Sequence, residues 1–248
     1  MERFFVPPEV LASETVELGR ELSHRLRNVL RLRTGAMVVF FDGRGREYEA
    51  VLEDMSAPAV RARVLRQREG IPEPRTRLVL YQSLIKGDRF DWVLEKGTEL
   101  GVAAFVPLIS HRSVMRPRGG NAGRSVRWRR IIVEAAEQCG RSVLPELASV
   151  TDLGEAFDSA LGLRLLPWEE ERALALRTVL REALSEGVKL AEVSLFIGPE
   201  GGFTRQEVDR ARDGGVRVVS LGSRILRSET AGIVAAAAVL WELGELGA

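Results

Sequence analysis

The residues with the clearest chemical character form a glycine-rich loop in the last third of this 248-residue chain. An apolar stretch ends at Ile197, the loop 198–202 reads Gly-Pro-Glu-Gly-Gly, and Thr204 with Glu207 has the spacing of a capping box that starts a helix. Adjacent glycines let a backbone approach a ligand closely, and α/β folds bind ligands at the carboxyl ends of parallel strands. The segment therefore predicts a ligand-binding turn between a strand and a helix.

The residue types of this loop favour a neutral or cationic ligand. The loop has neither the G-x-x-x-x-G-K-[ST] pattern of a P-loop nor the G-x-G-x-x-G spacing of a dinucleotide site. Pro199 removes one N–H donor, and Glu200 puts a negative charge where a phosphate would sit. A phosphate-binding enzyme stays open as an alternative, because the following helix offers free N–H groups.

A second loop of similar character follows about 20 residues later. Another apolar stretch ends at Leu221, Gly222 follows, and the segment 223–229 contains two arginines, two serines and a glutamate before a helix expected from about Thr230. Two loops that leave the carboxyl ends of strands close together can form one pocket.

The elements that must position these loops alternate between strands and helices from residue 76 onward. This alternation predicts a parallel sheet in an α/β fold. The last helix is apolar on nearly every side, so it must be buried in the core or against another subunit. The expected strands are 77–85, 103–108, 162–166, 193–197 and 216–221, and the expected helices are 88–100, 126–139, 151–160, 169–184, 205–213 and 230–246.

The start of the chain has a different pattern. Strands are expected over 36–41, 47–52 and 59–65, with one helix over 21–32, and short strands separated by turns suggest a small β-barrel. The segment Ile71-Pro72-Glu73-Pro74 is typical of a linker. We therefore expect one domain over 1–72 and a second over 73–248.

Basic residues cluster in the middle of the chain. Residues 100–133 contain seven arginines and no acidic residue, and of the 36 basic residues only Lys86, Lys96 and Lys189 are lysines. Arginine-rich segments of this kind favour contact with a polyanion such as a nucleic acid. A solvated loop and helix face is the alternative interpretation.

Composition excludes several classes of protein. One cysteine, Cys139, rules out an intramolecular disulfide, and two histidines make an all-histidine metal site unfavourable, so no metal is expected. The first residues lack the apolar core of a signal peptide, and the longest apolar run, 231–241, is too short to cross a bilayer. We expect a cytoplasmic protein without a membrane segment.

The two loops together resemble the signature of a known family. The sequences IGPEGGFT and SLGSRILRSETA are similar to those of the SPOUT methyltransferases, specifically the family that methylates N3 of a uridine in 16S ribosomal RNA. The same family is resembled by RFFV at 3–6, HRLRNVLRLRTG at 24–35, QSLIKGDRFDWVLEKGTELGV at 82–102 and RWRRIIVEAAEQCGR at 127–141.

The resemblance implies a fold and partners. It implies a PUA-like or OB-like β-barrel that helps to bind RNA, followed by an α/β SPOUT domain whose C-terminal part forms a deep trefoil knot. It also implies S-adenosylmethionine as the cofactor, a homodimer, and the 16S rRNA of the small ribosomal subunit as the substrate. Two other functions stay open: a non-catalytic RNA-binding or ribosome-assembly factor, and a methyltransferase that acts on another RNA.

The resemblance further implies roles for individual residues. Arg227 is the candidate for stabilising negative charge on the uracil, Glu229 is the candidate base or orienting group, and Lys86 and Arg89 are further catalytic candidates. The implied cofactor-binding residues are Leu166, Pro167, Ile197, Gly198, Pro199, Glu200, Gly201, Gly202, Ser220, Leu221, Gly222, Ile225, Leu226 and Arg227. The implied RNA-binding residues are Arg3, Arg27, Arg31, Arg112, Arg116 and Arg118.

Overall fold

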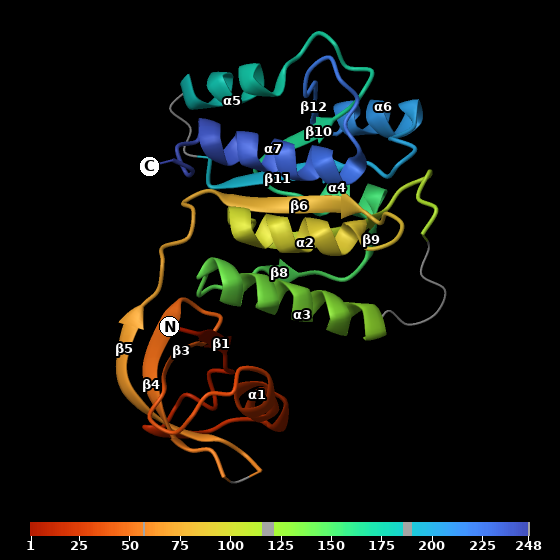
Figure 1. Ribbon diagram of the computed structural model, residues 1–248. Coiled ribbons are helices and arrows are strands. Elements are labelled where there is room, and N and C mark those ends of the chain that lie inside the picture. Colours follow the sequence, from red (N-terminus) through yellow and green to blue (C-terminus); the bar gives the residue numbers. More distant parts are fainter. Residues whose placement is uncertain (57, 116–121, 186–189, 248) are drawn as a thin grey trace. The chain divides into compact units, whose positions relative to one another are not determined.

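A computed structural model of the chain describes residues 1–56, 58–115, 122–185 and 190–247 (Figure 1). The chain divides into two compact units. The N-terminal unit contains Met1–Glu73 and Val133–Leu144, and the C-terminal unit contains Pro74–Ile132 and Pro145–Ala248. The first junction lies in the proline-containing segment 71–74. Residues 133–144 also belong to the N-terminal unit, whereas a single domain boundary near residue 72 would assign them to the C-terminal domain.

The N-terminal unit is built on a curled, PUA-like β half-barrel (Figure 1). Its described strands follow the order β1-β3-β4-β5-β2; β1 pairs with β3 in parallel and the other neighbours are antiparallel. Fully buried side chains such as Phe4, Phe40 and Leu52 fill the inner side of the curl. The strands are β1 (Arg3–Phe5), β2 (Thr15–Glu17), β3 (Met37–Phe41), β4 (Arg46–Asp54) and β5 (Arg61–Glu69).

The helix in this unit is shorter than expected. In place of one helix over 21–32, α1 (Arg20–His24) continues into a π-helical turn, η1 (Arg25–Val29). Leu26 is fully buried against the sheet, as the apolar spacing predicts. Arg31 adopts φ +54°, a left-handed conformation in which a helix cannot continue.

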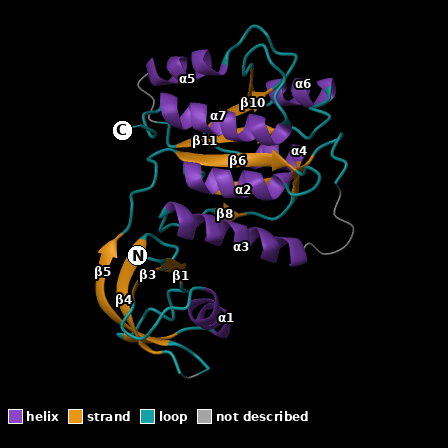
Figure 2. Cartoon of the chain, in the orientation of Figure 1, coloured by secondary structure: helices purple, strands orange, loops and turns teal. Residues whose placement is uncertain are grey.

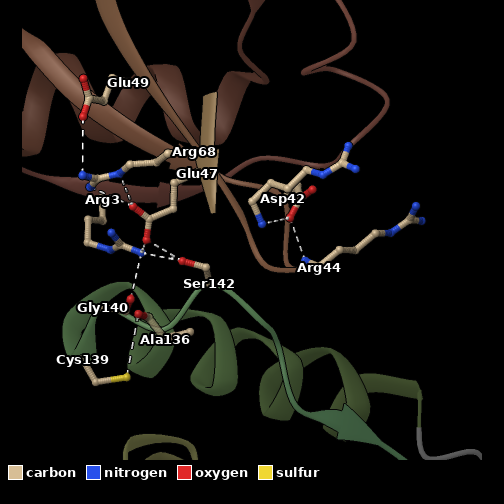
Figure 3. Close-up of polar contacts among 11 residues, drawn as sticks. Arg3, Asp42, Arg44, Glu47, Glu49, Arg68, Ala136, Cys139, Gly140 and Ser142 are labelled. Carbon is tan, nitrogen blue, oxygen red and sulfur yellow. Dashed lines mark hydrogen bonds and ion pairs between the residues drawn. The ribbon is translucent and has the colours of Figure 1, made fainter. Parts of the chain in front are cut away.

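A buried ionic network ties residues 133–144 to this unit (Figure 3). The Glu47 side chain is 3% exposed and accepts hydrogen bonds from Arg3 at 2.8 Å, Ser142 Oγ at 2.6 Å and Arg68 Nε at 2.9 Å. Arg3 also donates to the Gly140 carbonyl at 2.9 Å. Burial raises the pKa of the Glu47 carboxyl, but the bonds from Arg3, Ser142 and Arg68 outweigh it, so the net pKa lies below 4.5.

The C-terminal unit is an α/β domain around one parallel sheet (Figure 2). Within the described residues the strand order is β12-β10-β11-β6-β7-β8, with β9 also on β7, and every pairing is parallel. The strands are β6 (Arg77–Ser83), β7 (Ala104–Ile109), β8 (Glu146–Leu147), β9 (Thr151–Asp152), β10 (Leu163–Pro167), β11 (Glu192–Ile197) and β12 (Arg217–Val219). The fold class predicted from the alternation of strands and helices is confirmed.

Helices cover both faces of this sheet. On one face, α4 (Leu153–Ser159) and α6 (Arg205–Asp213) pack on a core that includes the stacked rings of Tyr81 and Phe196, whose centroids are 4.5 Å apart. On the other face, α7 (Ser228–Glu242) lies on β6 and β11, between α2 (Arg89–Leu100) and α5 (Leu176–Ser185). The helix α3 (Ala122–Cys139) runs through both units.

The predicted boundaries hold best where a cap marks them. The helix α6 spans 205–213 as expected, and its capping box between Thr204 and Glu207 is present. The helix expected over 169–184 begins only at Leu176. The earlier residues form a turn instead, because the Glu171 carboxylate accepts the Ala173 N–H at 2.8 Å and the Ser220 N–H donates to the Leu174 carbonyl at 2.8 Å.

Smaller shifts affect the ends of several other elements; for example, α3 begins at Ala122, α7 runs from Ser228 to Glu242, β5 ends at Glu69 and β12 covers only Arg217–Val219. No helix in the described part of the chain is long and apolar enough to cross a membrane.

Candidate functional site

A cavity of about 330 Å³ lies at the carboxyl edge of the parallel sheet. Its lining comes from the segments that follow β10, β11 and β12, together with Arg89 of α2 and the first turn of α7. Its volume is at the lower end of the range of small-molecule sites, about 300–1,000 Å³. The two glycine-rich loops that the sequence predicts as parts of one pocket do line the same cavity.

The conformation of the first loop depends on Gly202. Its N–H donates to the Pro199 carbonyl at 2.9 Å, and its φ is +67°. A Cβ on Gly202 would lie 2.2 Å from Glu169 Oε1, so a side chain here would meet the Glu169 carboxylate. Only glycine combines this left-handed turn with this close approach.

The loop after β12 is held by its backbone. The Ser220 N–H donates to the Leu174 carbonyl, and the Leu176 N–H donates to the Ser220 carbonyl at 3.1 Å. Gly222 then turns with φ +113°, and its N–H donates to Ser220 Oγ at 3.2 Å. These bonds fix the segments after β10 and β12 beside each other along one side of the cavity.

A buried hydrogen-bond chain lies beneath the cavity. Gln82, at the end of β6, is fully buried, and its Nε2 donates to Ser228 Oγ at 2.9 Å and to the Ser83 carbonyl at 3.2 Å. Ser228 Oγ donates in turn to the Gly198 carbonyl. Since the single Ser228 hydroxyl proton is used on Gly198, the Gln82 amide must present its N–H₂ to Ser228. The chain thus fixes the first glycine loop against the start of α7.

Charged side chains meet on the opposite side of the lining. Glu200 Oε1 accepts the Lys86 backbone N–H at 2.9 Å and lies 3.4 Å from Arg89 Nη1. Arg89 Nε lies 3.9 Å from Glu229 Oε1. Glu229 Oε2 is buried and has no hydrogen-bond partner among the described residues, and the same is true of the Trp168 indole N–H. The residues that line the cavity therefore include one buried acceptor atom and one buried donor atom that no described residue satisfies.

Comparison with known proteins supports the picture of an RNA-modifying enzyme. The model of the RNA methyltransferase domain family matches residues 72–240, and that of the RNA methyltransferase PUA domain matches residues 19–65. The ribosomal RNA small subunit methyltransferase E of Synechocystis sp. is 34% identical, covering 96% of this chain and 76% of the relative. This chain belongs to the ribosomal RNA small subunit methyltransferase E family.

Solved structures agree with this membership of the methyltransferase E family. A crystal structure of the enzyme from Neisseria gonorrhoeae, bound to S-adenosyl methionine, has a TM-score of 0.85 and 33% identity over 97% of each chain. A methyltransferase from Legionella pneumophila, also in complex with this cofactor, has a TM-score of 0.82 and 30% identity over 96% of each chain. The Bacillus subtilis relative is 29% identical over 98% of this chain and 97% of its own length.

Most of the residues that the family resemblance assigns to the cofactor come together at the cavity. The catalytic candidates Arg89 and Glu229 also line it. The cofactor candidates in the lining are Pro167, Ile197, Gly198, Pro199, Glu200, Gly202, Leu221, Gly222, Ile225, Leu226 and Arg227.

Four candidates lie elsewhere. The Leu166 side chain is fully buried in the core on the α4 and α6 face, because successive residues of a strand point to opposite sides. Gly201 is exposed, and its carbonyl accepts a bond from Arg112 at 2.7 Å. Ser220 acts through its backbone, and Lys86 is exposed with only its backbone N–H bonded to Glu200.

The predicted RNA-binding arginines differ in whether their guanidinium groups are bonded within the protein. Arg3 is taken up by the Glu47 network, and Arg27 donates to the carbonyls of Ser23, Met55 and Pro58. Arg112 donates to the Gly201 carbonyl, so its guanidinium helps to hold the glycine loop. Arg31 is exposed, and Arg116 and Arg118 lie outside the described residues.

Several lining residues were not among the predicted sites. Trp168 follows Pro167 directly, packs in the core at 7% exposure and also lines the cavity. The sequence could have indicated these residues only through their positions next to the predicted loops. The lining residues that were not predicted are Arg172, Phe203, Arg224, Ser228 and Ala231.

Proposed function

We propose that this chain transfers a methyl group from S-adenosylmethionine to N3 of a specific uridine in 16S rRNA of the small ribosomal subunit. The observation that supports this most is the single cavity in which both glycine loops meet Arg227 and Glu229. Family membership and two related structures bound to S-adenosyl methionine support the cofactor. The trefoil knot that the sequence resemblance implies for this domain stays a prediction.

The residues of the cavity fit S-adenosylmethionine. At Gly222 an added Cβ would meet nothing within 4 Å, so this glycine leaves open space for a ligand along the second loop. Leu221, Ile225 and Leu226 supply apolar surface for an adenine ring. The unpartnered indole N–H of Trp168 and the lining carboxylates offer a donor and acceptors for its polar groups. When bound, the cofactor supplies a methyl group on a positively charged sulfur.

Uridine N3 bears a proton and is a poor nucleophile until that proton leaves. We assign its removal to Glu229, because Oε2 is a buried acceptor with no partner among the described residues. Arg89, 3.9 Å from Glu229 Oε1, keeps this carboxylate oriented. When the N3 proton leaves, negative charge spreads onto O2 and O4 of the uracil, where a nearby cation stabilises it. Arg227 is the N-cap residue of α7 and lines the cavity, so we assign this role to its guanidinium.

We also propose that the chain acts as a homodimer through α7. From Thr230 to Trp241 the helix has no charged residue, yet Val234 and Trp241 are 44% and 65% exposed. These residues are seven apart and therefore lie on one face, away from the sheet. A second copy of the chain is the occupant that the family resemblance implies for this face. Replacement of Trp241 by glutamate should convert a dimer into a monomer in analytical ultracentrifugation, and a wild-type monomer would contradict the proposal.

Methyl transfer can be tested directly. Purified protein is incubated with labelled S-adenosylmethionine and small ribosomal subunits that lack the modification, and the digested RNA is analysed by mass spectrometry. We expect 3-methyluridine at one position. Label on another base would refute the N3 assignment but keep the methyltransferase. Cofactor binding without any transfer would favour a ribosome-assembly factor or a different RNA substrate.

A further inference from the structure

The arginines around the cavity fall into two groups. Arg89 is paired with Glu200 and Glu229, and Arg112 donates to a loop carbonyl. Arg172 and Arg224 also line the cavity, and both are exposed, but no hydrogen bond or ion pair is recorded for either within the described residues. Both guanidinium groups therefore lie at the cavity without a hydrogen-bond or ion-pair partner among the described residues.

The backbones that bear these two side chains are firmly held. On the side of Arg172, the Glu171 carboxylate accepts the Ala173 N–H, and this bond with those from Leu174 and Arg212 lowers the pKa of Glu171 despite its burial. On the side of Arg224, the Gly222 turn is closed by Ser220 Oγ. Each guanidinium therefore extends from an ordered turn.

The two turns are also joined to each other. Ala175 and Ser220 form a parallel β-bridge, and Ser220 exchanges backbone hydrogen bonds with Leu174 and Leu176. Arg172 lies three residues before this bridge on one strand, and Arg224 lies four residues after it on the other. The connection keeps both side chains on the rim of the same cavity.

The local charge indicates what they bind. Four arginines (Arg89, Arg172, Arg224 and Arg227) and three glutamates (Glu169, Glu200 and Glu229) line the cavity, so their formal charges sum to +1. Arg89 pairs with Glu200 and Glu229, whereas Arg172 and Arg224 have no ion-pair partner among the described residues, so their guanidinium groups are available to an anion at the rim. An enzyme that acts on a base extrudes the nucleotide into its pocket, which leaves the flanking phosphates at the pocket mouth. Guanidinium groups bind phosphate oxygens in a bidentate way.

We propose that Arg172 and Arg224 bind the RNA phosphates that flank the target nucleotide while its base faces the cofactor at the mouth of the cavity. This proposal rests on the proposed function, since it takes the ligand to be RNA. It moves RNA recognition to the rim of the cofactor cavity, away from Arg3, Arg27 and Arg112, whose side chains are engaged inside the protein.

Binding measurements test this without relying on turnover. Affinity for unmodified small ribosomal subunits is measured by filter binding at several salt concentrations for the wild type, R172A, R224A and the double variant. Each substitution should weaken binding by up to about fivefold at low salt and reduce the slope of log K against log salt by about 0.7. Arg75, exposed and just before β6 at the other end of the sheet, provides the matched control R75A.

Cofactor affinity separates this proposal from its rivals. Calorimetric titration with S-adenosylmethionine should give the same Kd for all variants and the wild type. Unchanged RNA affinity and salt slope in the double variant would overturn the proposal, as would a loss of cofactor affinity as large as the loss of RNA affinity. A wild type that binds subunits through these arginines but transfers no methyl group would refute the proposed function and leave the phosphate contacts standing.

Discussion

Replacing Gly232 by alanine should destabilise the protein, although alanine is the better helix former. Gly232 lies in the second turn of α7, where its Cα faces Gln82 at the end of β6. A Cβ would lie 2.7 Å from Gln82 Oε1. Carbon–oxygen contacts normally start at about 3.3 Å, so one partner must shift by roughly 0.6 Å.

The magnitude follows from what that shift breaks. Gln82 is fully buried, and its Nε2 is bonded to Ser228 and Ser83, so the amide cannot retreat freely. The substitution gains about 1 kcal/mol of helix propensity. Against this stand an overpacking cost of about 1–3 kcal/mol and about 1–3 kcal/mol for each buried polar group that loses its partner. With one such group, we expect a net loss of about 1–5 kcal/mol in the free energy of unfolding.

The assay is urea denaturation followed by circular dichroism, with Gly123→Ala as the matched control. Gly123 is also helical, but an added Cβ would meet nothing within 4 Å, so this variant should be unchanged or slightly stabilised. Gly232→Ala should also bind S-adenosylmethionine more weakly, because the displaced Gln82 amide reaches Gly198 through Ser228. A Gly232→Ala protein at least as stable as the wild type, with unchanged cofactor affinity, would refute the reasoning.

Three further predictions follow from contacts of the same kind. Ser228→Ala should raise the Kd for S-adenosylmethionine about tenfold in calorimetry while Ser223→Ala leaves it unchanged, because only Ser228 is bonded to the glycine loop. Glu229→Gln should lower the methylation rate at least about 100-fold with cofactor affinity retained; a rate near that of the wild type would exclude Glu229 as the base. Glu47→Gln should lower the free energy of unfolding by about 3 kcal/mol at neutral pH, whereas Glu53→Gln, which removes an exposed pair with Arg63, should change it little.

The Glu47 effect has a defined pH dependence. Because the folded-state pKa lies below 4.5, ionised Glu47 stabilises the fold at pH values above 4.5. That contribution is lost as the pH falls through the folded-state pKa. The stability difference between wild type and Glu47→Gln should therefore shrink on acidification, and a constant difference down to low pH would contradict the buried ion network.

Helix caps and the spacing of apolar residues predicted those elements of the fold that depend on neighbouring residues in the sequence. The capping residues Thr204 and Glu207 marked α6 to the residue, and the alternation of apolar strands with helices predicted the parallel sheet. The turn at 171–175 could not be predicted in this way. Its leucine spacing suits a helix, but Glu171 and the distant Ser220 take the backbone N–H and C=O groups that a helix would use. Long-range pairing overrides local propensity there.

The same distinction explains which site residues the sequence could identify. Loop glycines and their neighbours are found by motif, and most of those predicted do line the cavity. The state of an arginine is decided by partners far along the chain: Arg3 meets Glu47 and Ser142, and Arg112 meets Gly201. Charge clustering therefore indicates a polyanion as the ligand, whereas the choice of the arginines that bind it stays a prediction. Arg172 and Arg224 line the cavity and have no internal partner among the described residues, which is why we propose that they bind RNA there.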